Sequence, residues 1–177
     1  MRKSCIPNLF TFINLSCGIV SILSVMNENY AMASIFILLA GLVDRYDGRI
    51  ARYLQVSSDL GKELDSLADL VSFGVAPSIL TYILYNLSEF GPKGIIGLAI
   101  LLAFPICGAF RLARYNTATF DGVFTGVPIT IVGCFMALFN LIVVIFKFKE
   151  AIPAFLVIIL MIIGSYLMVS TLKLKKV

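Results

Sequence analysis

The chain has 177 residues, of which 60% are hydrophobic, and a formal net charge of +4. Soluble domains have about 45–50% apolar residues, so the excess predicts a membrane protein and leaves too few polar residues for a separate soluble domain. Histidine is absent, which excludes Ser-His-Asp and Cys-His catalysis and any histidine-ligated metal site. Acid–base chemistry must therefore fall to carboxylates.

Six apolar stretches follow one another, and each is about long enough to cross the hydrocarbon core of a bilayer. They cover approximately residues 9–26, 31–52, 61–87, 94–115, 127–146 and 152–172. Polar turns or loops separate them, and Pro77 is expected to kink the third. The sequence predicts an all-α fold: one integral membrane domain, residues 1–177, built as a bundle of six transmembrane helices.

Lysine and arginine are distributed unequally between the two sides of such a bundle. With six spans, both termini and the second–third and fourth–fifth links share one side, which carries eleven of the 14 basic residues. These are Arg2, Lys3, Arg45, Arg49, Arg52, Lys62, Arg111, Arg114, Lys173, Lys175 and Lys176. The rich side is expected to be cytoplasmic. Basic residues at span ends indicate membrane rather than nucleic acid, and the lysine tail is expected to attract anionic headgroups without affecting turnover.

The four cysteines are scattered along the chain and lie mostly in apolar stretches. They are Cys5, Cys17, Cys107 and Cys134. Their spacing fits neither a zinc site nor a redox motif, so they are interpreted as small packing residues.

Acidic residues mark the end of the second stretch and the start of the third. Asp44 and Asp47 are three residues apart, whereas Gly61, Asp65 and Asp69 follow at intervals of four. Residues so spaced share one face of a helix, so two facing helices would bring four carboxylates together. Such carboxylates repel one another unless a cation intervenes, and a hard divalent cation, or a pair, suits an all-oxygen site. Because acidic residues near lipid are energetically costly, their presence here predicts a functional site.

Small and basic residues accompany these acids. Gly48 and Ala51 remove side-chain bulk, so a ligand could approach the backbone there. Arg52 adds a guanidinium fork suited to phosphate. Together with the aspartates, they predict a metal-bridged phosphate site.

The whole pattern, D-x2-D-G-x2-A-R-x8-G-x3-D-x3-D, runs from Asp44 to Asp69 with every fixed position present. It resembles the signature of the CDP-alcohol phosphotransferase family. Three further pieces are similar to the phosphatidylserine synthase branch: IPNLFTFIN at 6–14, FRLARYN at 110–116 and TGVP at 125–128. They occur in family order.

The resemblance implies a transferase acting on CDP-diacylglycerol, or on the archaeal CDP-linked isoprenoid lipid. An alcohol would attack the lipid-linked phosphorus and CMP would leave, with two divalent ions, Mg²⁺ or Mn²⁺, bound by Asp44, Asp47, Asp65 and Asp69. Asp69 would act as general base. Because a carboxylate held tightly by a metal is a weak base, either Asp69 is loosely coordinated or the metal acidifies the hydroxyl, and both alternatives remain open. The resemblance also implies a homodimer.

Contacts to the CDP moiety are expected from two regions. Asn8, Thr11 and Asn14 recur at three-residue steps and share a face of the first span, where they would line the nucleotide pocket or form interhelical hydrogen bonds. From the signature, the resemblance implies contacts by Gly48, Ala51, Arg52 and Gly61.

The acceptor is expected to be L-serine. Arg111 and Arg114 are three residues apart and face one side, where they could hold a phosphate or a carboxylate, or only anchor the helix at the membrane surface. The resemblance adds Asn116, Thr125 and Gly126. Inositol phosphate and glycerol phosphate are alternative acceptors.

A metal-ion or phosphate transporter is a further alternative, because intramembrane acids also mark ion paths. Against it, the acids cluster at one side and no broken segments recur in two halves.

Overall fold

The computed structural model describes residues 5–54, 59–117, 124–171 and 173–174, and side chains within 8–46, 59–117 and 126–171. The main helices are α1 (Cys5–Met26), α2 (Tyr30–Leu54), α3 (Asp59–Asp69), α4 (Ala76–Leu84), α5 (Ile95–Thr117), α6 (Ile129–Ile145) and α7 (Ala154–Val169). Shorter segments are a π-helix, η1 (Leu70–Val75), and three 3₁₀ turns, η2 (Leu87–Glu89), η3 (Pro92–Gly94) and η4 (Phe148–Ala151). Two short strands, β1 (Phe124–Thr125) and β2 (Lys173–Leu174), pair antiparallel.

The helical bundle that the apolar stretches predicted is present. Within the described residues, three helical stretches are long and apolar enough to cross a membrane: Asn8–Met26, Asp59–Leu84 and Pro92–Thr117. Helices α6 and α7 are apolar but shorter. Helix α2 is apolar up to Val43 and carries the charged signature beyond it. The structure thus has the composition of a membrane bundle.

The turn between α1 and α2 shows why the first two helices separate where they do. Glu28 adopts a positive φ of 58°, which ends the helical path after Met26. The side-chain oxygen of Asn29 then accepts a hydrogen bond from the backbone N–H of Met32 at 3.2 Å. This bond satisfies a donor in the first turn of α2, as N-cap residues do.

Helices α3 and α4 form one continuous run through η1. The backbone N–H of Ala76 donates to the carbonyl of Val71, five residues earlier. The expected irregularity therefore precedes Pro77, which lies in the first turn of α4, where its missing N–H is tolerated. Widening the helix one turn before the proline accommodates its ring.

The π-helix η1 lies at the centre of the bundle, where glycines let other helices approach it. A Cβ added to Gly18 of α1 would lie 2.5 Å from the Ser72 hydroxyl oxygen, and one added to Gly133 of α6 would lie 2.5 Å from the Phe73 carbonyl oxygen. Phe73 is fully buried. Small residues at helix crossings are the usual route to close packing inside membranes.

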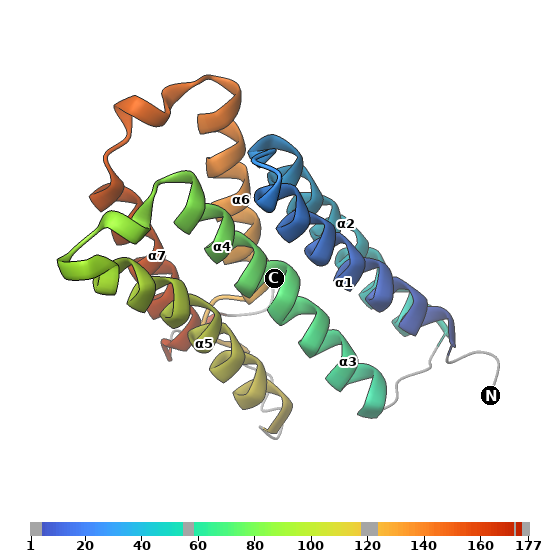
Figure 1. The fold of residues 1–177 in the computed structure, drawn as a ribbon. Coiled ribbons are helices and arrows are strands. Elements are labelled where there is room, and N and C mark those ends of the chain that lie inside the picture. Colours follow the sequence, from blue (N-terminus) through green and yellow to red (C-terminus); the bar gives the residue numbers. More distant parts are fainter. Residues whose placement is uncertain (1–4, 55–58, 118–123, 172, 175–177) are drawn as a thin grey trace.

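Figure 1 shows α1 lying along α2 and α5 lying along α7, with the run of α3, η1 and α4 between these pairs. The ends of α5 and α7 and the start of α6 meet, because Arg114 bonds to Val169 and the N–H of Val127 bonds to Leu167. The charged half of α2 and the start of α3 extend to this same end of the bundle.

Replacing Gly133 with alanine should destabilise the bundle. The new methyl group would overlap the backbone of Phe73, and overpacking of a tight core typically costs about 1–3 kcal/mol. We expect a lower Tm for the detergent-solubilised protein. Ile131→Ala, at a largely exposed position of the same helix, is the matched control. An unchanged or raised Tm for Gly133→Ala would contradict the close approach of α6 to η1.

Candidate active site

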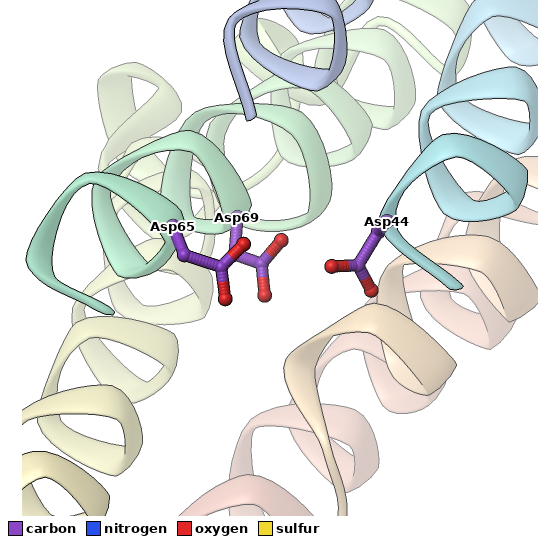
Figure 2. A group of neighbouring side chains, drawn as sticks. All are labelled: Asp44, Asp65 and Asp69. Atoms are coloured by element: carbon purple, nitrogen blue, oxygen red, sulfur yellow. The ribbon is translucent and has the colours of Figure 1, made fainter. Parts of the chain in front are cut away.

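Three of the predicted acids converge in the folded chain. Carboxylate oxygens of Asp44, Asp65 and Asp69 all lie within 4.8 Å of one another. Asp44 projects from α2, and the two others project from neighbouring turns of α3 toward it (Figure 2). Asp69 is only 8% exposed, and the other two are half-buried. The helical spacing on α3 therefore does gather carboxylates on one face.

Close packing of α2 on α6 fixes the backbone that carries Asp44. A Cβ added at Gly41, one turn before Asp44, would lie 2.6 Å from the sulfur of Cys134. Cys134 therefore packs against α2 where α2 and α6 cross. The interpretation of Cys134 as a packing residue agrees with this contact.

Asn14 connects α1 to the acidic helix. Its amide nitrogen donates to Oδ1 of Asp69 at 3.0 Å, and its backbone carbonyl accepts a bond from the Ser72 hydroxyl at 2.9 Å. Asn14 is 1% exposed, and its Oδ1 has no partner among the described residues. The side chain thus makes the interhelical bond that was one alternative, and it retains an acceptor atom for another group. Thr11 is buried one turn earlier, and Asn8 is half-buried.

The remaining signature residues are less completely described. Asp47, Gly48, Ala51 and Arg52 belong to α2, but their side-chain positions lie outside the described part of the chain. Gly61 is half-buried in the first turn of α3. Their predicted contacts to metal and nucleotide stay predictions.

Arg111 lies on α5, which packs against both α3 and η1. It is 9% exposed, and its guanidinium interacts electrostatically with Asp69. The guanidinium carbon lies 5.7 Å from the centre of the Tyr115 ring, one turn later on α5. Within the described chain, its Nε atom has no hydrogen-bond partner. A buried guanidinium donor without a partner is costly and indicates a site for an anionic group.

Arg114 has different partners, although it lies on the same helix three residues later. Its two terminal nitrogens donate to the carbonyl oxygens of Val169 at 3.0 Å and Ser170 at 3.2 Å. These are carbonyls at the end of α7, where intrahelical donors run out. Arg114 therefore caps α7.

Asn116 ties the end of α5 to the acidic helix. Its amide donates to the Ser66 hydroxyl at 2.9 Å and to the Glu63 carboxylate at 3.3 Å. Ser66 and Glu63, like Ser72, were not singled out from the sequence, although Ser66 directly follows Asp65. Thr125 lies in β1 with its side chain outside the described set, and Gly126 is buried with a positive φ of 79°.

The donor set fits a hard divalent cation. Three carboxylates within 4.8 Å supply charged oxygen ligands and no sulfur or imidazole. Mg²⁺ and Mn²⁺ prefer such ligands, and bound charge would offset the repulsion among the acids.

The comparisons with known proteins agree with this chemistry. The family described as CDP-alcohol phosphatidyltransferase matches residues 4–174. The CDP-diacylglycerol–serine O-phosphatidyltransferase of Bacillus subtilis is 38% identical over 175 residues, which make up 95% of this chain and 88% of that protein. The protein of that name from Helicobacter pylori strain J99 is 41% identical over 128 residues, or 70% of this chain and about half (52%) of that protein.

An archaeal relative is also similar over nearly the whole chain. The archaetidylserine synthase of Methanothermobacter thermautotrophicus is 35% identical over 176 residues, covering 97% of this chain and 70% of that protein. The similarity therefore extends over almost the whole chain and is not limited to the signature at Asp44–Asp69. The chain belongs to the CDP-alcohol phosphatidyltransferase family, a family of transferases.

Proposed function

We propose that this enzyme transfers the phosphatidyl group of CDP-diacylglycerol, or the equivalent group of an archaeal CDP-linked isoprenoid lipid, to the hydroxyl of L-serine. The serine oxygen bonds to the lipid-linked phosphorus, the bond from that phosphorus to the CMP oxygen breaks, and the serine proton passes to a base. The relatives' names support both lipid versions. The observation that carries the proposal is the convergence of Asp44, Asp65 and Asp69, with the buried Arg111 on a helix that packs against α3.

Asp44, Asp47, Asp65 and Asp69 would hold two divalent ions, Mg²⁺ or Mn²⁺. When bound, these ions would neutralise the diphosphate and the charge that develops on the leaving CMP. Arg52, Gly48, Ala51 and Gly61 would contact the nucleotide. Asn8, Thr11 and Asn14 would form its second wall, and the spare acceptor atom of Asn14 supports that assignment.

Asp69 would accept the proton of the serine hydroxyl. The amide of Asn14 donates a hydrogen bond to Oδ1 of Asp69 and so fixes the orientation of that carboxylate. A carboxylate fixed in this way needs little rearrangement to act as a base. This arrangement favours the alternative in which Asp69 is only loosely coordinated.

Arg111 would bind the serine carboxylate. Its buried guanidinium, its nearness to Asp69 and its unpartnered Nε support this role. A guanidinium pairs with a carboxylate through two parallel hydrogen bonds. Asn116, Thr125 and Gly126 would complete the acceptor side, and Arg114 would support it from the end of α7.

We propose that the protein crosses the membrane six times, with both termini and the active site at the cytoplasmic face. We also propose that it assembles as a homodimer. The excess of basic residues on one side supports the orientation. The lipid chains would stay in the bilayer. Membership in a transferase family favours this enzyme over a metal-ion or phosphate transporter.

Acceptor choice tests the proposal directly. Purified protein with CDP-diacylglycerol and Mg²⁺ or Mn²⁺ should release CMP when L-serine is added, because Arg111 and its neighbours would bind a small carboxylate. Glycerol phosphate and inositol phosphate should release much less. Faster CMP release with either phosphate acceptor would assign the arginine to a phosphate group and reject serine as the substrate.

Removal of divalent ions should abolish CMP release, because the carboxylates would repel one another and the diphosphate. Asp44→Asn and Asp65→Asn should each raise the concentration of Mg²⁺ or Mn²⁺ needed for half-maximal rate. Asp59→Asn, at the exposed start of the same helix α3, is the control. Full activity in excess chelator would show that the aspartates do not bind a divalent ion that the reaction requires.

Arg111→Lys should raise the KM for serine about ten- to a hundredfold, the usual loss for a charged hydrogen bond, since lysine keeps the charge but loses the fork. The KM for the CDP-lipid should change less. Lys149→Gln, in the turn η4, serves as the control. If only CDP-lipid binding suffers, Arg111 contacts the nucleotide side instead.

A further inference from the structure

The end of α7 is joined to α5 through a side chain that reaches across the bundle end. Arg114, in the last turn of α5, donates to the carbonyls of Val169 and Ser170. The Ser170 hydroxyl adds a bond to the carbonyl of Leu167 at 2.8 Å. The last turn of α7 is thus held to α5 at the end of the bundle that contains the acids.

The chain that enters α6 is held to the same place. The backbone N–H of Val127 donates to the carbonyl of Leu167 at 3.1 Å. A Cβ added to Gly126 would lie 2.5 Å from the Met168 carbonyl oxygen and 3.1 Å from a terminal nitrogen of Arg114. The positive φ and the lack of space both require glycine at this position.

The segment that follows α7 then pairs with the segment that precedes Gly126. Strand β2 runs antiparallel to β1, with Thr125 opposite Lys173 and Phe124 opposite Leu174. Residues 124–127 are therefore bonded on one side by β2 and on the other by the end of α7.

This assembly adjoins the proposed acceptor side. Arg111, which interacts electrostatically with Asp69, lies one turn before Arg114 on α5. Asn116, two residues after Arg114, bonds to Ser66 of the acidic helix. The last turn of α5 therefore bridges the acids and the end of α7, so a shift of that end would move the groups proposed to contact serine.

We infer that the described residues after α7, Ser170, Thr171, Lys173 and Leu174, form a positioning element for the acceptor: they hold residues 124–127 and the last turn of α5 against the acidic helix. The inference rests on the proposed function. It gives the tail two different roles. Lys173 and Leu174 act through backbone pairing, whereas Lys175 and Lys176, outside the described residues, keep their expected attraction to headgroups.

Truncation after Thr171 tests the inference. Loss of the β1–β2 hydrogen bonds should raise the KM for serine roughly tenfold, while kcat and the KM for the CDP-lipid stay within about twofold of the full chain. The double variant Lys175→Ser/Lys176→Ser removes charge without removing β2 and should leave all three constants unchanged. Equal serine KM values for the truncated and full chains would overturn the positioning role.

Gly126→Ala provides a second variant if the truncated chain fails to fold. It should raise the KM for serine in the same way, because the methyl group would push residues 124–127 away from α7. A loss of kcat with an unchanged KM for serine would count against the inference.

A crosslink checks the pairing without any activity. Thr125→Cys/Lys173→Cys should form a disulfide on mild oxidation, detected by peptide mass spectrometry, since directly opposed strand residues approach closely enough. Thr125→Cys/Lys149→Cys is the control pair. If the crosslink forms but serine never releases CMP, the proposed function fails while the pairing stands; absence of the crosslink overturns the inference itself.

Discussion

Electrostatic repulsion among three carboxylates is the constraint on which the rest of the structure depends. Their oxygens lie within 4.8 Å of one another, and one of the acids is almost fully buried. Their mutual repulsion opposes this arrangement, so the fold must hold it by packing and hydrogen bonds, and the proposed cation would compensate the charge. The contacts around η1 supply that support. Gly18 and Gly133 bring α1 and α6 against it, and Asn14 bonds to both Asp69 and Ser72.

The position of η1 directly after Asp69 follows from the same constraint. A π-helix shifts the register of the residues after it relative to those before it. Asp65 and Asp69 therefore keep the α-helical spacing that gathers their carboxylates, while Ser72 and Phe73 take positions that suit α1 and α6. Pro77 contributes by removing an N–H donor that an unbroken α-helix would need.

Periodicity in the sequence was sufficient to predict the helical bundle and the shared face of Asp65 and Asp69, because both depend on residues three or four apart. The approach of Asp44 also required α2 and α3 to face each other, and the side chain of Asp47, the fourth predicted acid, lies outside the described residues. The π-helix and the β1–β2 pair were not predicted. They depend on contacts between distant residues, such as Thr125 with Lys173, and two-residue strands have no periodicity to detect. From the sequence, the span 61–87 was expected to kink at Pro77. In the structure, the irregular segment is the π-helix η1, which ends before Pro77.

Arg111 and Arg114 of α5 likewise have partners that residue spacing alone does not predict. Their spacing places them on one face, and from that alone both are candidates for the same anion. In the fold, α7 ends beside Arg114 and supplies carbonyl acceptors, while Arg111 interacts electrostatically with Asp69 and keeps an unpartnered nitrogen among the described residues. The end of α7 thus gives the two arginines different partners. One guanidinium completes the protein's own hydrogen bonds, and the other, one turn away on the same helix, is the one that we propose to bind the acceptor. Two arginines of one short motif can therefore differ in their contacts, because the neighbours that the fold brings to each side chain decide which hydrogen bonds it forms.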